Sequence, residues 1–366
     1  MNTVQSLDEM LALAYNHVGV CLSIYMPTHR KGPDTQQNSI RFKNLLREAE
    51  NQLVQSDLRP SEIRELLAPA QELLNNELFW RSQLEGFVLF LSPDSFHSFK
   101  TPVTLEERVV VSDRFHLKPL IGMMARDTNF LILAISQSNV RLFECTCWKN
   151  REVSLNGIPQ SLTEALDLDD FEKRLQLHTG SENTKMKVLK FFQQVDRGLQ
   201  DILRDRRDPL IFAGVEYLFP IYREANTYQY LLAGLIPGSP EGLTGDDLRR
   251  MALPLIGDIL KAKERESLDL YRKSAGTGLA SRDIREIVQA ASHGRVGTLF
   301  AARDIEQWGV YNSDTGDVVL SDPPAPSSWD LVDHAAINAL FNGGTVYVLD
   351  SSEIPGGGSM AAVFRY

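Results

Sequence analysis

Residues 130–145 read FLILAISQSNVRLFEC, and this stretch predicts two adjacent β-strands at the centre of the fold. The apolar run from Phe130 to Ile135 is typical of a buried strand. Ser138 and Asn139 supply a turn, and Val140 to Cys145 then alternates apolar and polar residues, as a partner strand does. The stretch therefore predicts a sheet with a buried strand.

Downstream of this sheet the pattern becomes helical. From about Thr184 to Arg206, apolar residues recur close to every 3.6 positions. They are Val188, Leu189, Phe192, Val195, Leu199 and Leu203. Leu210 to Ala213 predicts a further strand, and Leu243 to Glu266 predicts a helix with Thr244 as its cap. Helices that alternate with strands predict an α/β domain.

Helices also alternate with strands in the sequence before and after this domain, so three α/β domains are predicted. An N-terminal α/β domain is expected over residues 1–126, a middle domain over 127–270, and a C-terminal αβα domain over 279–366. The Gly276-Thr277-Gly278 segment provides the clearest linker signal between the last two. Ser61 and Ser281 are expected to cap helices in the outer domains.

Composition limits the function. The 366 residues include 38 Lys plus Arg and 48 Asp plus Glu, a net charge of −10. This balance argues against bulk binding to nucleic-acid phosphates but leaves room for a local basic segment. Residues 266–366 carry 7 basic and 13 acidic side chains, so most of the surplus lies there. With three cysteines, no basic-apolar leader and no apolar run of membrane-spanning length, we expect a reduced, cytoplasmic protein.

Four phrases resemble the bacterial archaeo-eukaryotic release factor superfamily, relatives of class I release factors and Pelota. They are YMPTHRKGPDTQQNSIRFKNLLREAENQL from Tyr25, KVLKFFQQVDRGLQDIL from Lys187, GVEYLFPIYREANTY from Gly214, and AINALFNGGTVYVLDSSEIPGGGSMAAVFRY from Ala336. The resemblance implies a ribonuclease H-like middle domain and a last domain similar to the kink-turn-binding ribosomal protein fold. It also implies a bacterial protein that associates with the ribosome or tRNA in termination, rescue or quality control.

The sequence departs from this family at its catalytic motif. Release factors carry a Gly-Gly-Gln tripeptide that positions the water attacking the peptidyl-tRNA ester. The corresponding loop here, residues 177–183, reads LHTGSEN, with one glycine and no following glutamine. The resemblance therefore implies docking on the ribosome or tRNA without peptidyl-tRNA hydrolysis by that motif.

A basic segment follows the first predicted strand and is the leading candidate for binding RNA or phosphate. Its residues are Thr28, His29, Arg30, Lys31, Arg41, Lys43 and Arg47. Turns at strand ends are frequent ligand sites in α/β proteins, and Lys43 and Arg47 share a helix face at i and i+4. In the alternative reading, the segment is a solvated turn whose arginines pair with Asp34, Glu48 or Glu50.

His178 and Lys185 form a second candidate, at a loop that leads into a helix. A histidine that titrates near neutrality, beside free helix N–H groups, could serve a hydrolase of an RNA or small ester or phosphoester. In the alternative, Ser181 or Asn183 simply caps the helix.

No metal or cofactor site is expected. Cys145 and Cys147 share a strand face, but the sequence offers no nearby second pair of ligands, so they are interpreted as structural. No P-loop, GxSxG or HExxH motif occurs. A third hypothesis is a scaffold that recruits a protein partner through its acidic C-terminal domain.

Overall fold

The computed structural model describes residues 12–14, 19–30, 32, 34–56, 58–124, 128–136, 138–155, 158, 182–321 and 328–366. This described part is mixed α/β and contains four sheets, which confirms the predicted class. The chain forms two compact units: Met1–Ala125 together with Glu264–Tyr366, and Arg126–Lys263. The division into three domains stays a prediction. Within the described part, no helix is both long and apolar enough to cross a membrane.

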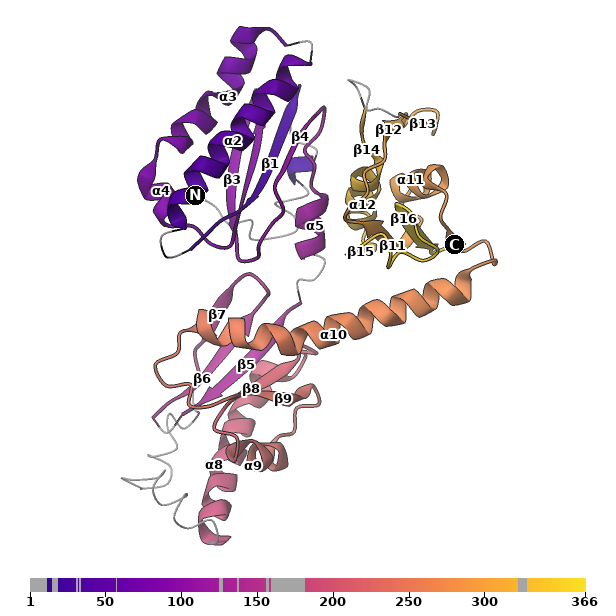
Figure 1. Cartoon of the computed structure of the whole chain (residues 1–366). Helices are drawn as coiled ribbons and strands as arrows, with labels where there is room; N and C mark the ends of the chain where they lie inside the picture. Colours follow the sequence, from indigo (N-terminus) through magenta and orange to yellow (C-terminus); the bar gives the residue numbers. More distant parts are fainter. Residues whose placement is uncertain are drawn as a thin grey trace. The chain divides into compact units, whose positions relative to one another are not determined.

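The N-terminal part of the first unit is an antiparallel sheet in the order β3-β2-β1-β4. Its strands are β1 (Cys21–Pro27), β2 (Gly86–Ser92), β3 (Ser95–Thr101) and β4 (Arg108–Ser112). One face is covered by α2 (Thr35–Val54), α3 (Pro60–Leu74) and α4 (Glu77–Arg81), as Figure 1 shows. Leu22, Ile24 and Met26 alternate along β1 toward these helices, because successive strand residues point to opposite faces.

The C-terminal part of the first unit contains two sheets, in the orders β10-β16-β11-β15 and β13-β12-β14. The strands of the larger sheet are β10 (Ala280–Ser281), β11 (Val296–Ala302), β15 (Thr345–Leu349) and β16 (Met360–Phe364). Those of the smaller are β12 (Trp308–Tyr311), β13 (Val318–Leu320) and β14 (Trp329–Asp330). Two helices accompany them, α11 (Ile284–Ser292) and α12 (Leu331–Phe341), and α5 (Lys118–Met124) precedes the second unit. Helix α12, LVDHAAINALF, is buried over most of its length, so its Asp333 and His334 are buried too.

The second unit is a five-stranded sheet in the order β7-β6-β5-β8-β9. Its strands are β5 (Phe130–Ile135), β6 (Val140–Cys145), β7 (Asn150–Val153), β8 (Leu210–Gly214) and β9 (Leu231–Pro237). Strand β5 is buried on both faces, as predicted. Alternate β5 residues, including Leu133, pack with α8 (Glu182–Leu203) and α9 (Leu218–Ala225). The others, including Ile132, pack against α10 (Gly245–Ser274).

Several predicted boundaries were wrong. Helix α3 begins at Pro60, and the Glu62 carboxylate accepts the Arg59 N–H at 2.7 Å, so Ser61 is not the cap. Proline suits the first helical position because its missing N–H is not needed there. Similarly, Asp283 rather than Ser281 caps α11, by accepting the Arg285 N–H at 2.8 Å. Helix α10 runs to Ser274, beyond the predicted end at Glu266.

Candidate functional site

The basic segment after β1 is held in a defined turn. The Thr28 N–H donates to the Glu85 carbonyl at 2.9 Å, and its hydroxyl donates to the Leu84 carbonyl at 2.8 Å. The Asn38 side chain accepts the His29 N–H at 2.9 Å and donates to the His29 carbonyl at 3.0 Å. Thr28 is 3% exposed. Thr28 and the His29 backbone therefore shape this turn.

Arg41 also supports the turn. Its Nε lies 2.7 Å from the Glu107 carboxylate, and its guanidinium donates to the Pro27 carbonyl at 3.0 Å. The alternative reading paired the arginines with nearby acids, whereas the partner of Arg41 is distant in sequence. Because its guanidinium binds the end of β1, Arg41 connects α2 to that strand.

Three cations of the segment remain exposed: Arg30, Lys43 and Arg47. Lys43 and Arg47 lie one turn apart on α2. No ion pair joins these three side chains to another residue in the described part of the chain. Lys31 lies outside the described residues. Among the described arginines and lysines of the segment, Arg30, Lys43 and Arg47 are therefore the ones free to contact a phosphate directly.

Replacing Arg41 by methionine is expected to lower the free energy of unfolding by about 1 kcal/mol. The substitution keeps the apolar stem but removes a hydrogen bond to a backbone carbonyl and a half-buried ion pair. Urea denaturation of the purified protein measures the change. Arg47→Met is the matched control on the same helix and should change stability by less than about 0.5 kcal/mol. Equal effects would contradict the supporting role of Arg41.

The second predicted site is only partly described. Lys185 is 63% exposed and lies 3.5 Å from the Glu224 carboxylate. His178 lies outside the described residues, as do Ser181 and the rest of its loop. Asn183 belongs to α8, but its side chain is not among those described. The role of the His178 loop stays a prediction.

The cysteines show no metal-binding arrangement. Cys21 and Cys145 are buried, and Cys147 is half-buried. Burial raises the pKa of Cys145 to about 12, so this thiol stays protonated. Among the described residues, no group of three or more His, Cys, Asp or Glu side chains is placed to hold a metal ion.

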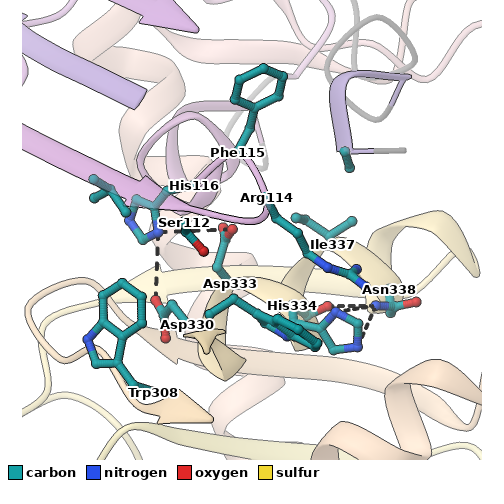
Figure 2. Close-up of a pocket in the computed structure, with 13 residues that line it drawn as sticks. Ser112, Arg114, Phe115, His116, Trp308, Asp330, Asp333, His334, Ile337 and Asn338 are labelled. Carbon is teal, nitrogen blue, oxygen red and sulfur yellow. Dashed lines mark hydrogen bonds and ion pairs between the residues drawn. The ribbon is translucent and has the colours of Figure 1, made fainter. Parts of the chain in front are cut away.

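A buried charged cluster in the first unit was not predicted. It joins His116 and Lys118 to Asp330 and Asp333, which are far away in the sequence. The Lys118 ammonium lies 3.0 Å from the Asp330 carboxylate. The His116 Nδ1 lies 3.9 Å from Asp330 and 4.0 Å from Asp333 (Figure 2). Lys118 also donates to the Ile305 carbonyl at 2.6 Å.

The acidic members of this cluster also bind backbone N–H groups. Asp330 caps α12 by accepting the Val332 N–H at 3.0 Å, and it accepts the Gln307 N–H at 3.1 Å. Both Asp333 oxygens accept the Leu117 N–H, at 3.0 and 3.1 Å. The cluster therefore ties α12 to the segment that enters α5.

Burial changes the protonation states within the cluster. It raises the pKa of Asp333 to about 8, with the neighbouring Asp330 adding to the shift. It lowers the pKa of His116 to about 3, against the opposing effect of Asp330. Near neutral pH, His116 is therefore uncharged and Asp333 is largely protonated. Lys118 and Asp330 then form the charged pair.

A pocket of about 430 Å³, open solvent included, adjoins this cluster. Arg114 stacks over the Trp329 ring, with 4.5 Å between the guanidinium carbon and the ring centroid, and both line the pocket beside His334. Burial lowers the pKa of His334 to about 4. Since the carboxylates beside the pocket hold backbone groups, we interpret this arrangement as structural.

The comparisons with known proteins bear on the second unit. Residues 129–295 match the model of "Bacterial archaeo-eukaryotic release factor family 3". The predicted resemblance to this superfamily is confirmed. The family 3 match includes two of the four resembling phrases, those that begin at Lys187 and Gly214. The phrases from Tyr25 and Ala336 lie outside it. No curated protein matches the chain.

Several solved structures are similar to this chain over most of its length. The archaeal translation termination factor aRF1 is 17% identical, with 98% of this chain and 96% of that chain covered and a TM-score of 0.24. Archaeoglobus fulgidus Pelota is 11% identical, with 99% and 92% covered and a TM-score of 0.38. S. cerevisiae Dom34, a translation termination-like factor, is 12% identical, with 76% and 80% covered and a TM-score of 0.34.

Proposed function

We propose that this chain acts in translation termination, ribosome rescue or quality control by docking on a ribosome or a tRNA-containing complex in the cytoplasm. The observation that carries the proposal is the family 3 match over residues 129–295. Because the sequence contains no Gly-Gly-Gln tripeptide, we propose docking without peptidyl-tRNA hydrolysis by that motif. The acidic surplus beyond residue 266 is available for a protein partner.

We further propose that the chain has three domains, with a ribonuclease H-like middle domain. The sheet order β7-β6-β5-β8-β9 supports the latter proposal. Strands β5, β8 and β9 run parallel, whereas β6 pairs antiparallel with both β5 and β7. The C-terminal sheet with α11 and α12 is the part that would resemble the kink-turn-binding ribosomal protein fold.

The proposed RNA contact in the first unit consists of Arg30, Lys43 and Arg47. All three side chains are exposed: Arg30 follows the turn that Arg41 and Thr28 hold in place, and Lys43 and Arg47 lie one turn apart on α2. A small cationic surface on an acidic protein supports local docking on a phosphate backbone and does not need a large release of counterions.

Cosedimentation with ribosomes tests this contact. The full-length protein is expected to pellet with stalled or empty ribosomes at low salt, and the Lys43→Glu/Arg47→Glu variant is expected to pellet at least fivefold less. The matched control is Arg64→Glu/Arg81→Glu, which makes the same charge change at exposed positions of α3 and α4. If the parent protein pellets with no ribosomal state, docking is refuted. If both variants pellet equally, the assignment to α2 is refuted.

A peptidyl-tRNA hydrolysis assay tests the proposed lack of this activity. No release of peptide above the uncatalysed rate is expected with stalled complexes. Release would overturn that part of the proposal and favour the alternative hydrolase with His178. In that event the His178→Ala variant should lose the activity, and a fully active variant would exclude His178.

A further inference from the structure

The outward face of α8 carries a line of cations. The buried face of this helix packs into the core of the second unit through Val188, Phe192, Val195 and Leu199. Lys190, Arg197 and Arg204 follow one another at intervals of seven residues, about two turns, and are exposed. At 100° per residue these three positions lie opposite the buried face. Arg204 directly follows the last residue of α8, Leu203.

The charge on this face is mostly positive. Its exposed side chains, with the two residues that follow the helix, are Met186, Lys187, Lys190, Gln193, Gln194, Arg197, Gln200, Asp201, Arg204 and Asp205, four basic and two acidic. Arg204 and Asp201 pair at 2.9 Å, but both are more than 70% exposed, so the pair contributes little stability. Lys187, Lys190 and Arg197 have no ion-pair partner among the residues whose side chains are described.

The residue types on this face suit a phosphate backbone better than a protein surface. Protein interfaces depend on buried aromatic or aliphatic anchors. From Lys185 to Leu203, Met186 is the one exposed large apolar side chain. The glutamines between the cations offer amide groups that hydrogen-bond to phosphate and sugar oxygens. The cations span about 20 Å along the helix, at 1.5 Å per residue.

We propose that this face of α8, defined by Lys187, Lys190, Arg197 and Arg204, binds the phosphate backbone of structured RNA. The inference rests on the proposed function, since it assigns an RNA contact to the segment that matches family 3. It adds a contact in the second unit to the one proposed on α2 in the first. The contact recognises charge and carries no base specificity.

Salt-dependent RNA binding by the full-length protein tests the proposal. Fluorescence anisotropy with a labelled 20-base-pair RNA hairpin gives the affinity between about 50 and 200 mM salt. The Lys190→Gln/Arg197→Gln/Arg204→Gln variant should bind at least tenfold more weakly at the low-salt end. The slope of log affinity against log salt should become shallower by about 2 to 3, at roughly 0.9 per lost phosphate contact. Glutamine preserves helix propensity, and circular dichroism checks the fold.

The matched control removes three exposed cations from α10, as Lys261→Gln/Arg265→Gln/Lys273→Gln. It should retain the parent slope. The inference would be overturned if the control lost as much RNA affinity as the α8 variant. It would also be overturned if the α8 variant bound RNA as well as the parent, or if the parent bound no RNA. Ribosome cosedimentation separates the two proposals. If the parent protein binds the hairpin through α8 but pellets with no ribosome, only the proposed ribosome docking is refuted. If the parent pellets normally and the α8 variant keeps the parent salt slope for RNA binding, only the α8 contact is refuted.

Discussion

The Asp330→Asn variant is expected to unfold with about 3–5 kcal/mol less free energy than the parent protein. Its partner Lys118 has a side chain that is 1% exposed, and the ammonium lies 3.0 Å from the lost charge. Asparagine caps helices as well as aspartate does, so the substitution removes the charge while it keeps the cap of α12. The cost is therefore that of a buried ammonium without its counterion. Urea denaturation at neutral pH measures it.

Two controls define this effect. Asp269→Asn removes a carboxylate that pairs with Arg272 on the surface, where both side chains are more than half exposed, and should cost less than about 1 kcal/mol. Lys118→Met combined with Asp330→Asn removes both charges and should recover at least about 2 kcal/mol of the loss. A single Asp330→Asn variant that loses less than about 1 kcal/mol would contradict the buried ion pair.

The second large effect is a dependence of stability on pH. The free energy of unfolding is expected to be highest near pH 6.5 and to fall by about 1 kcal/mol between pH 6.5 and 8. Asp333, whose pKa in the folded protein is raised to about 8, stabilises the fold fully below about pH 4. That contribution is lost as the pH rises toward 8, because the carboxyl must ionise while buried beside Asp330.

The histidines act in the opposite direction. The pKa of His116 is lowered to about 3 and that of His334 to about 4, so both favour the fold above pH 6.5 and lose this contribution as the pH falls. In the folded protein, Asp333 alone of these three groups titrates between pH 6.5 and 8. The histidines of the unfolded chain lose their remaining protons over the same range and offset part of the effect of Asp333. Urea denaturation midpoints measured from pH 6.5 to 8 show how stability changes with pH.

Asp333→Asn is the diagnostic variant for this pH dependence. Its amide oxygen can still accept the Leu117 N–H, but the side chain cannot ionise. Its free energy of unfolding should therefore no longer fall from pH 6.5 to 8, whereas the loss of stability below pH 6.5 that the histidines cause should remain. A parent protein with constant stability over this range would contradict the raised pKa, as would an unchanged slope in the variant.

The sequence alone predicted secondary structure correctly where the apolar residues of a segment form a continuous run or recur at a regular spacing. Phe130 to Ile135 and the stripe along α8 led to a correct strand and a correct helix, because burial imposes their periodicity. Strand β3 (Ser95–Thr101) was missed, since SFHSFKT is polar and forms an edge strand of the sheet. The cap at Ser61 was wrong because the helix already begins at Pro60, and the cap at Ser281 was wrong because the Asp283 carboxylate accepts the first free N–H of α11.

The sites were less predictable than the fold. Lys43 and Arg47 could be placed on one exposed face from their spacing alone, whereas the ion pair of Arg41 with Glu107 depends on tertiary packing. The cluster around Lys118 and Asp330 joins residues about 210 positions apart, a distance that no motif spans. One signal was present: Asp333 is the one acidic residue of a mostly apolar helix, where a carboxyl group needs hydrogen-bond partners.

The first unit is assembled from the two ends of the chain, and this sets the order in which the protein can fold during synthesis. The continuous middle unit can fold as soon as it emerges, whereas the ion pair of Lys118 with Asp330 must wait for the C-terminal part of the first unit. At roughly 5–20 residues per second, about 10–40 s separate the synthesis of Lys118 from that of Asp330. During this interval Lys118 lacks its counterion and Leu117 lacks its acceptor on Asp333, so we expect the segment that enters α5 to become fixed only after the C-terminal part has been made.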